Sequence, residues 1–187
     1  MQFGERTTFA IEAMSEVGLQ TPSAVWGRMQ IWCQGAAIGD YTKEHCGLFD
    51  AYDGFKQLDA KWDGLWTPDF EELSDLQIWN YLDWRLYGCH DNAVVDADAR
   101  TVEECRNDWQ KFGDFNFLTN WGEQFDQAGK SFILCRRDDI VSVLKWSSSI
   151  SCPIVLHAPL GSVRNAIRDF SEWFEIESKR LSGGTAM

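Results

Sequence analysis

The stretch Val25-Trp-Gly-Arg-Met-Gln-Ile-Trp-Cys33 alternates between two kinds of residue. One set is small or apolar and consists of Val25, Gly27, Met29, Ile31 and Cys33. The other set carries large amphipathic or polar side chains and consists of Trp26, Arg28, Gln30 and Trp32, with Gln34 following. Because successive side chains of a strand point to opposite faces, this period of two predicts a half-buried antiparallel strand.

Further strands are predicted on both sides of this one. Their ranges are 7–17, 36–38, 115–118, 131–135, 140–146 and 153–157. Pro153 lacks the N–H group that a central strand needs, so the last of these strands is expected at a sheet edge. The strands therefore fall into two groups, one near each end of the chain.

Helical patterns separate and follow the two groups of strands. A helix is predicted over 46–62, a second from the capping box Ser74/Gln77 to Gly88, a third from the capping box Thr101/Glu104, and a long one over 163–181 with Ser162 as its N-cap. This order predicts an α+β fold, an antiparallel sheet with helices packed on one side and a long C-terminal helix. We expect one domain over 1–182 and a flexible tail over 183–187.

The charge of the chain is concentrated in its middle third. The net charge is −12, and the segment 59–126 holds 16 acidic residues against five basic ones. Such a balance argues against binding nucleic acid or an anionic membrane, because both need clustered Lys and Arg. It favours a basic protein, which acidic side chains attract over a distance.

The same segment contains six of the ten tryptophans. Tryptophan is prominent at the centres of interfaces, so acids mixed with tryptophans are typical of a docking surface, although we expect more than half of the tryptophans to fill the core. The predicted partner-binding residues are Asp63, Trp66, Asp69, Glu71, Glu72, Asp75, Asp91, Asp96 and Asp98. Trp62 is expected to join Trp66 in filling apolar pockets of the partner.

The six cysteines form no CxxC pair and no compact disulfide framework. The N-terminus carries Glu5 and Arg6 where a signal peptide would need an apolar run, and no uncharged stretch reaches the roughly 20 residues of a membrane span. We therefore expect a reduced, cytoplasmic protein that uses neither a metal nor a cofactor. The oligomeric state cannot be read from these patterns.

Enzymatic chemistry finds little support in the motifs. Cys89-His90-Asp91 contains the residue types of a thiol hydrolase, but catalytic triads assemble from distant segments, so a turn at a helix end explains the run better. Paired acids such as Glu71-Glu72 lie in polar surroundings, where nothing would raise a carboxyl pKa for acid catalysis. The patterns predict a binding protein and not an enzyme.

Both ends of the chain resemble a known family. Phe3-Gly-Glu5, Phe9-Ala-Ile-Glu12 and Ile38-Gly-Asp40 look like the opening of immunity family forty-two of bacterial polymorphic toxin systems, together with Trp32 to Gly35. The strand around Trp146 and the helix from Phe170 to Phe174 are similar to that family's ending. The matching residues look structural, so none is carried over as a binding residue.

The resemblance implies a cytoplasmic protein that binds and neutralises a cognate secreted toxin. The net charge favours a basic toxin, and a nuclease with a cationic cleft is our first choice, while an ADP-ribosylating or other toxin remains open. Two rival functions remain open: an adaptor or chaperone that leaves a secreted effector active, and a cysteine-dependent hydrolase. An effector that stays toxic when it is co-expressed with this protein would indicate the adaptor or chaperone. Alkylation of Cys89 that abolishes function while binding persists would indicate the hydrolase.

Overall fold

The computed structural model describes residues 1–90, 93–94, 98–147 and 150–183. Its strands are β1 Gln2–Glu5, β2 Phe9–Ser15, β3 Trp26–Cys33, β4 Ala36–Ile38, β5 Cys46–Gly47, β6 Cys89–His90, β7 Ala93–Val94, β8 Ser131–Cys135, β9 Ile140–Ser147 and β10 Cys152–Pro159. Its α-helices are α1 Phe49–Asp59, α2 Asp75–Tyr87, α3 Val102–Phe112 and α4 Leu160–Leu181. Short 3-10 helices are η1 Trp62–Gly64, η2 Pro68–Phe70, η3 Gly113–Phe115 and η4 Glu123–Ala128. The α+β class and the long C-terminal helix are confirmed.

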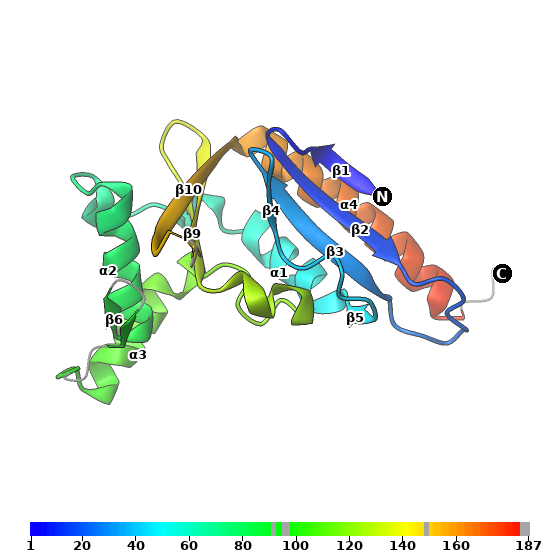
Figure 1. The fold of residues 1–187 in the computed structure, drawn as a ribbon, viewed down its shortest axis with the longest axis horizontal. Helices are drawn as coiled ribbons and strands as arrows, with labels where there is room; N and C mark the ends of the chain where they lie inside the picture. The colour runs from blue at the N-terminus through cyan, green and yellow to red at the C-terminus, as the bar shows by residue number, and fades with distance from the viewer. Residues whose placement is uncertain (91–92, 95–97, 148–149, 184–187) are drawn as a thin grey trace.

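The N-terminal sheet is antiparallel and follows the order β1-β2-β3-β4, with β5 also pairing with β3. Along β3 buried and half-buried residues alternate without a break, which confirms the period of two. The buried face of the sheet packs against α4, where the rings of Phe3 and Phe170 lie 5.9 Å apart. Helix α1 continues this layer through Phe55, whose ring lies 5.6 Å from that of Phe170. Figure 1 shows α4 running behind the sheet.

The second sheet is also antiparallel and follows the order β10-β9-β8. Its strand β10 lies at an edge, as Pro153 predicts. The outward-facing N–H of His157 donates to Gln34 Oε1, at 3.0 Å, which ties this edge to the end of β3. Backbone alternation places Pro153, Val155 and Pro159 on the same outward side as His157. Since proline has no N–H group, Val155 is the remaining outward donor among these four residues.

Several details differ from the sequence predictions. The strands form two separate sheets and the short β6-β7 hairpin instead of one sheet, and β5 occupies the start of the helix predicted over 46–62. Strand β1 was not predicted, and the strand predicted over 115–118 is wrong. That segment leaves η3, makes one isolated bridge between Asn116 and Phe132, and then turns at Leu118, whose φ of 67° a strand cannot accommodate. Helix α4 also begins at Leu160, two residues before the predicted N-cap Ser162. The reason is that the pairing of β9 with β10 continues to the first residue of the helix, where Leu160 N–H donates to Asp139 O.

Gly54 weakens the helical pattern of α1 in the sequence but has a packing role in the structure. A Cβ atom at this position would lie 2.4 Å from Cε2 of Trp121, whose ring covers the helix at that point. Alanine normally stabilises a helix relative to glycine, whereas here we expect Gly54→Ala to lower the free energy of unfolding by about 1–3 kcal/mol.

Urea denaturation measures this difference, and Gly161→Ala in α4 is the matched control. No heavy atom outside its chain neighbours and its own helix backbone lies within 4 Å of a Cβ at Gly161, so this variant should gain up to about 1 kcal/mol. Equal stabilisation by both substitutions would show that the contact between Gly54 and Trp121 imposes no constraint.

Candidate partner-binding surface

The predicted acidic residues begin on a short, well-capped segment between α1 and α2. Thr67 caps η2, which holds Asp69, and Ser74 forms with Gln77 the predicted capping box that starts α2 at Asp75. Carboxylates at these positions suit the positive end of the helix dipole. The left-handed Gly88 ends α2, also as predicted.

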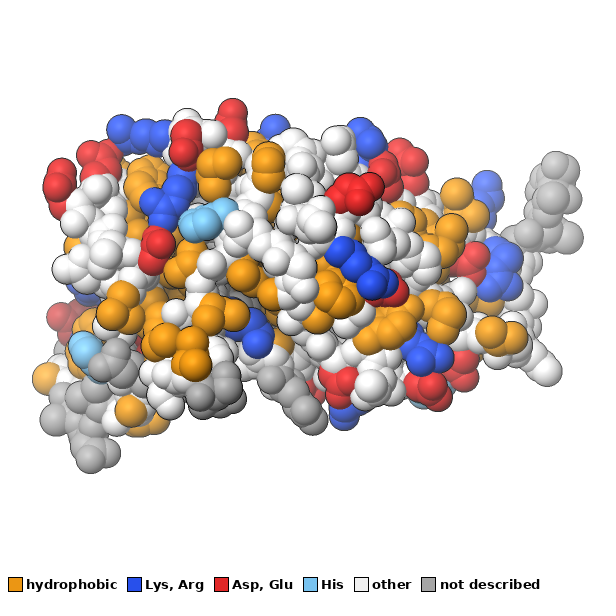
Figure 2. Space-filling view, turned by 45° about the horizontal axis from the view of Figure 1, so that its top comes forward, with side chains coloured by type: hydrophobic (Ala, Val, Ile, Leu, Met, Phe, Trp, Pro, Cys, Tyr) orange, Lys and Arg blue, Asp and Glu red, His pale blue; other side chains and the backbone are white. Residues whose placement is uncertain are grey.

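Three of these acids pair with cations of the chain itself. Asp69 binds Lys111 of α3 at 2.7 Å, and this hydrogen bond holds the pKa of Asp69 below its usual value. Glu71 pairs with Arg137, and Asp75 pairs with Arg136. Figure 2 shows acidic and basic side chains next to one another over much of the visible surface. These acids are therefore partly neutralised by Lys111 of α3 and by the two arginines that follow β8.

Glu72 and Asp63 differ from these three acids. Both are exposed, and no salt bridge joins either one to another residue within the part of the chain that the structure describes. Glu72 lies beside Glu71, whereas Asp63 lies on η1. The structure thus brings Asp69, Glu71, Glu72 and Asp75 to one region at the start of α2.

Asp98 belongs to a different cluster. A Cβ atom at Gly88 would lie 2.8 Å from Asp98 Oδ2, which places Asp98 at the end of α2, about 20 Å along this 13-residue helix from Asp75. Hydrogen bonds from Arg100 lower the pKa of Asp98 to about 2. Asp91 and Asp96, the two remaining predicted acids, lie outside the described residues.

The tryptophans of the segment are less available than predicted. Trp62 is wrong as an anchor for a partner, because only 2% of it is exposed and its Nε1 donates to Asp59. Trp66 is partly buried against Phe70, and the guanidinium of Arg136 lies 5.5 Å from its ring centroid. A partner that contacts Trp66 would therefore also contact Arg136.

The cations Lys111, Arg136 and Arg137 are the residues that sequence reasoning missed. Arg136 and Arg137 lie 61 and 66 residues from the acids that they contact, so no local pattern connects them. The run Arg137-Asp-Asp, between the strands predicted over 131–135 and 140–146, indicates only a turn. For Lys111 the sequence offers one weak indication, its place in the last turn of α3, which is the next helix after α2.

The residues of the alternative function, a cysteine-dependent hydrolase, occupy separate environments. Cys89 is buried, and its thiol donates to the carbonyl oxygen of Tyr87 at 3.5 Å. His157 Nδ1 lies 3.0 Å from Ser142 Oγ in the second sheet, and His45 stacks on Trp26 in the first. Within the described residues, no hydrogen bond joins Cys89 to either of these two histidines.

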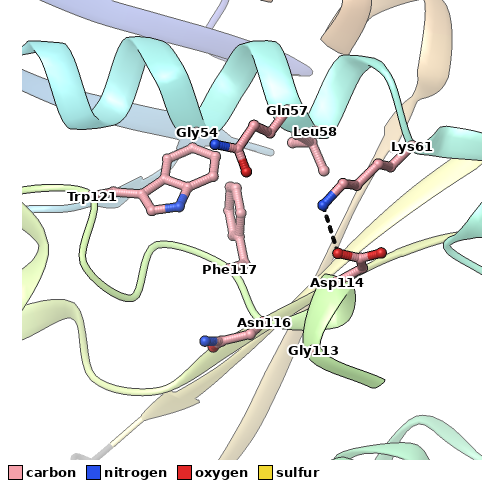
Figure 3. Close-up of a pocket in the computed structure, with 9 residues that line it drawn as sticks. All are labelled: Gly54, Gln57, Leu58, Lys61, Gly113, Asp114, Asn116, Phe117 and Trp121. Carbon is pink, nitrogen blue, oxygen red and sulfur yellow. Dashed lines mark hydrogen bonds and ion pairs between the residues drawn. The ribbon is translucent and has the colours of Figure 1, made fainter. Parts of the chain in front are cut away.

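A hollow beside α1 is small for a substrate site. It has a volume of about 120 Å³, below the about 300–1,000 Å³ of typical ligand pockets, whereas other hollows on the described residues measure about 310–370 Å³. Figure 3 shows Trp121 and Phe117 on one side of it, and Lys61 bound to Asp114 on the other, at 2.6 Å. Among the described helices, none combines the length and the apolar character that a membrane crossing requires.

Comparison with known proteins identifies the family. The model of the family described as immunity protein 42 matches residues 1–173 of the 187 residues. The chain belongs to the immunity protein 42 family. The resemblance of the two chain ends is thereby confirmed, and the family match also spans the acidic middle.

A solved structure shares the fold of this immunity family member. It is described as the crystal structure of CdiI from Burkholderia dolosa AUO158, with a TM-score of 0.61 and 14% sequence identity. The match covers 92% of this chain and 99% of the crystallised one. A comparison with curated proteins found no match.

Proposed function

We propose that the protein binds a cognate secreted antibacterial toxin in the cytoplasm and neutralises it by stoichiometric inhibition, without chemistry of its own. Membership of the immunity protein 42 family is the observation that carries this proposal. A fold relative that is named CdiI agrees with it. The excess of acidic residues in the segment 59–126 favours a basic toxin domain, with a nuclease as the first choice.

The proposed contact surface is the group Asp69, Glu71, Glu72 and Asp75, extended by Asp63 and Trp66. Exposed ion pairs contribute only about 0–1 kcal/mol each, so a partner's Arg or Lys can replace Lys111 or Arg137 at little cost. Glu72 needs no such exchange, because no salt bridge holds it within the described ranges. The complex should bury on the order of 1,600 Å² and cover the toxin's basic active-site cleft.

The test is a titration of the purified toxin domain with the purified protein. We expect toxin activity to fall linearly with the molar ratio and to end at one inhibitor per toxin, with a lower apparent affinity at high ionic strength. Co-expression should also protect cells that carry the active toxin domain.

Two outcomes would contradict this proposal. If the toxin keeps its activity when it is saturated with this protein, the protein is an adaptor or chaperone. Inhibition at far less than equimolar protein would show an enzyme that modifies the toxin, and alkylation of Cys89 would then test the thiol.

A further inference from the structure

Helix α3 has its polar and apolar residues on unexpected sides. Asp108 is only 8% exposed, although it is charged. Val102 is 78% exposed and Trp109 is 43% exposed, although both are apolar. These two residues lie seven positions apart, so they share one side of the helix. The helical spacing of the sequence places Val102, Cys105 and Trp109 on one stripe, and in the structure Cys105 is partly buried while Val102 and Trp109 are open to solvent.

The buried contact of α3 with α2 joins a charged cluster to an aromatic pair, because the rings of Phe112 and Tyr81 lie 5.4 Å apart beside Asp108. Asp108 accepts hydrogen bonds from Arg85 Nη1 at 3.3 Å and from Arg100 Nη1 at 3.0 Å. Arg100 also donates to the carbonyl oxygen of Arg85 at 2.8 Å and lies 4.6 Å from the ring centroid of Trp84. A charged group joined at several points fixes the rotation of α3 about its own axis.

The exposed stripe is held in place before any partner arrives. The predicted capping box of Thr101 and Glu104 is formed at the start of α3. The ring of Trp109 packs edge-on against Tyr87 of α2, with centroids 6.1 Å apart. Figure 1 shows α2 and α3 side by side at the end of the molecule opposite the C-terminus. A rigid helix at the end of an elongated molecule presents a convex surface.

We propose that α3 is the ridge that enters the cleft of the toxin domain, with Val102 and Trp109 filling an apolar depression in its wall. This inference rests on the proposed function and specifies its contact surface. Lys111, which binds Asp69, lies on the side of α3 opposite to Val102. A partner that encloses α3 therefore contacts both sides of the helix. An amphipathic helix in a groove is a common mode of recognition.

The occupant is identified by charge. The first turn of α3 carries two exposed carboxylates, Glu103 and Glu104, so a basic rim suits the start of this ridge. The exposed Glu103 lies on the outer surface of α3, next to Val102. A cationic cleft with an apolar wall would pair with the acidic side chains and would bury Val102 and Trp109.

The experiment compares binding of the toxin domain by the full chain and by its Val102→Ala/Trp109→Ala variant. We expect at least tenfold weaker binding, caused mainly by faster dissociation. The factor by which affinity falls should be the same at low and high ionic strength, because no charge is altered. Val102→Ser alone, at a site with little packing to lose, should weaken binding several-fold.

The matched control removes exposed apolar side chains elsewhere. Phe49→Ala/Ile176→Ala truncates residues that are 59% and 66% exposed on α1 and α4, and its binding should equal that of the unaltered chain. Unchanged binding by both the α3 double variant and Val102→Ser would overturn the inference. If the unaltered chain itself does not inhibit the toxin, the proposed function fails instead.

Discussion

Replacing Glu71, Glu72 and Asp75 together with lysine is expected to slow association with the toxin domain by about 100-fold at low ionic strength. Electrostatic steering raises association rates from about 10⁵–10⁶ to 10⁸ M⁻¹s⁻¹ or more, and the triple variant would turn attraction into repulsion. The new lysines would also lie beside Arg136 and Arg137, which lose their acidic partners. Stopped-flow mixing at several salt concentrations measures the effect.

A second triple variant separates local charge from net charge. Glu5, Asp53 and Glu172 are exposed and lie outside the acidic segment, so their replacement by lysine changes the net charge by the same amount. This control should reduce the association rate far less. Equal slowing by both variants would mean that the net charge alone steers the toxin, and rates that both variants leave unchanged would remove steering from the mechanism.

Asp108→Ala is expected to lower the free energy of unfolding by about 3–5 kcal/mol. The substitution leaves Arg85 and Arg100 without the carboxylate that joins them, and breaking one partner of a buried charged cluster costs about this much. Arg100 keeps Asp98, so the loss should concentrate in the attachment of α3 to α2. Hydrogen exchange of α3 should therefore accelerate more than that of the N-terminal sheet.

Asp108→Asn provides the graded comparison. An amide can retain part of the hydrogen bonding while losing the charge, so this variant should be less destabilised than the alanine variant. If α3 carries the interface as proposed, Asp108→Ala should also weaken toxin binding. A variant as stable as the unaltered chain would show that apolar contacts, such as that of Phe112, hold α3 in place.

The elements that the sequence predicts correctly are those that local chemistry determines. The alternation along β3 depends on neighbouring residues, and the two capping boxes each need residues only three apart. The wrong strand at 115–118 shares this locality, because its apolar residues alternate correctly until Leu118 takes a left-handed conformation. Apolar alternation contains no information about that turn.

The candidate surface depends on contacts that cross the chain. Sequence reasoning located the acids, but it could not place Arg137 next to Glu71, because β8 and its following turn reach the start of α2 only in the fold. The exposure of Val102 and Trp109 could not be predicted from their helical spacing, because it depends on the burial of Asp108, which is uncommon for a charged residue. Which of the predicted acids contact a partner remains a prediction.

The outer side of β10 has a consequence for how this protein meets other chains. Pro153 and Pro159 cannot donate, and His157 N–H is already used by Gln34. An incoming strand would find a single backbone donor, at Val155, over the whole edge. Strand pairing along β10 is thereby hindered, because an incoming strand could use the outward carbonyl oxygens of this edge but only one of its N–H groups.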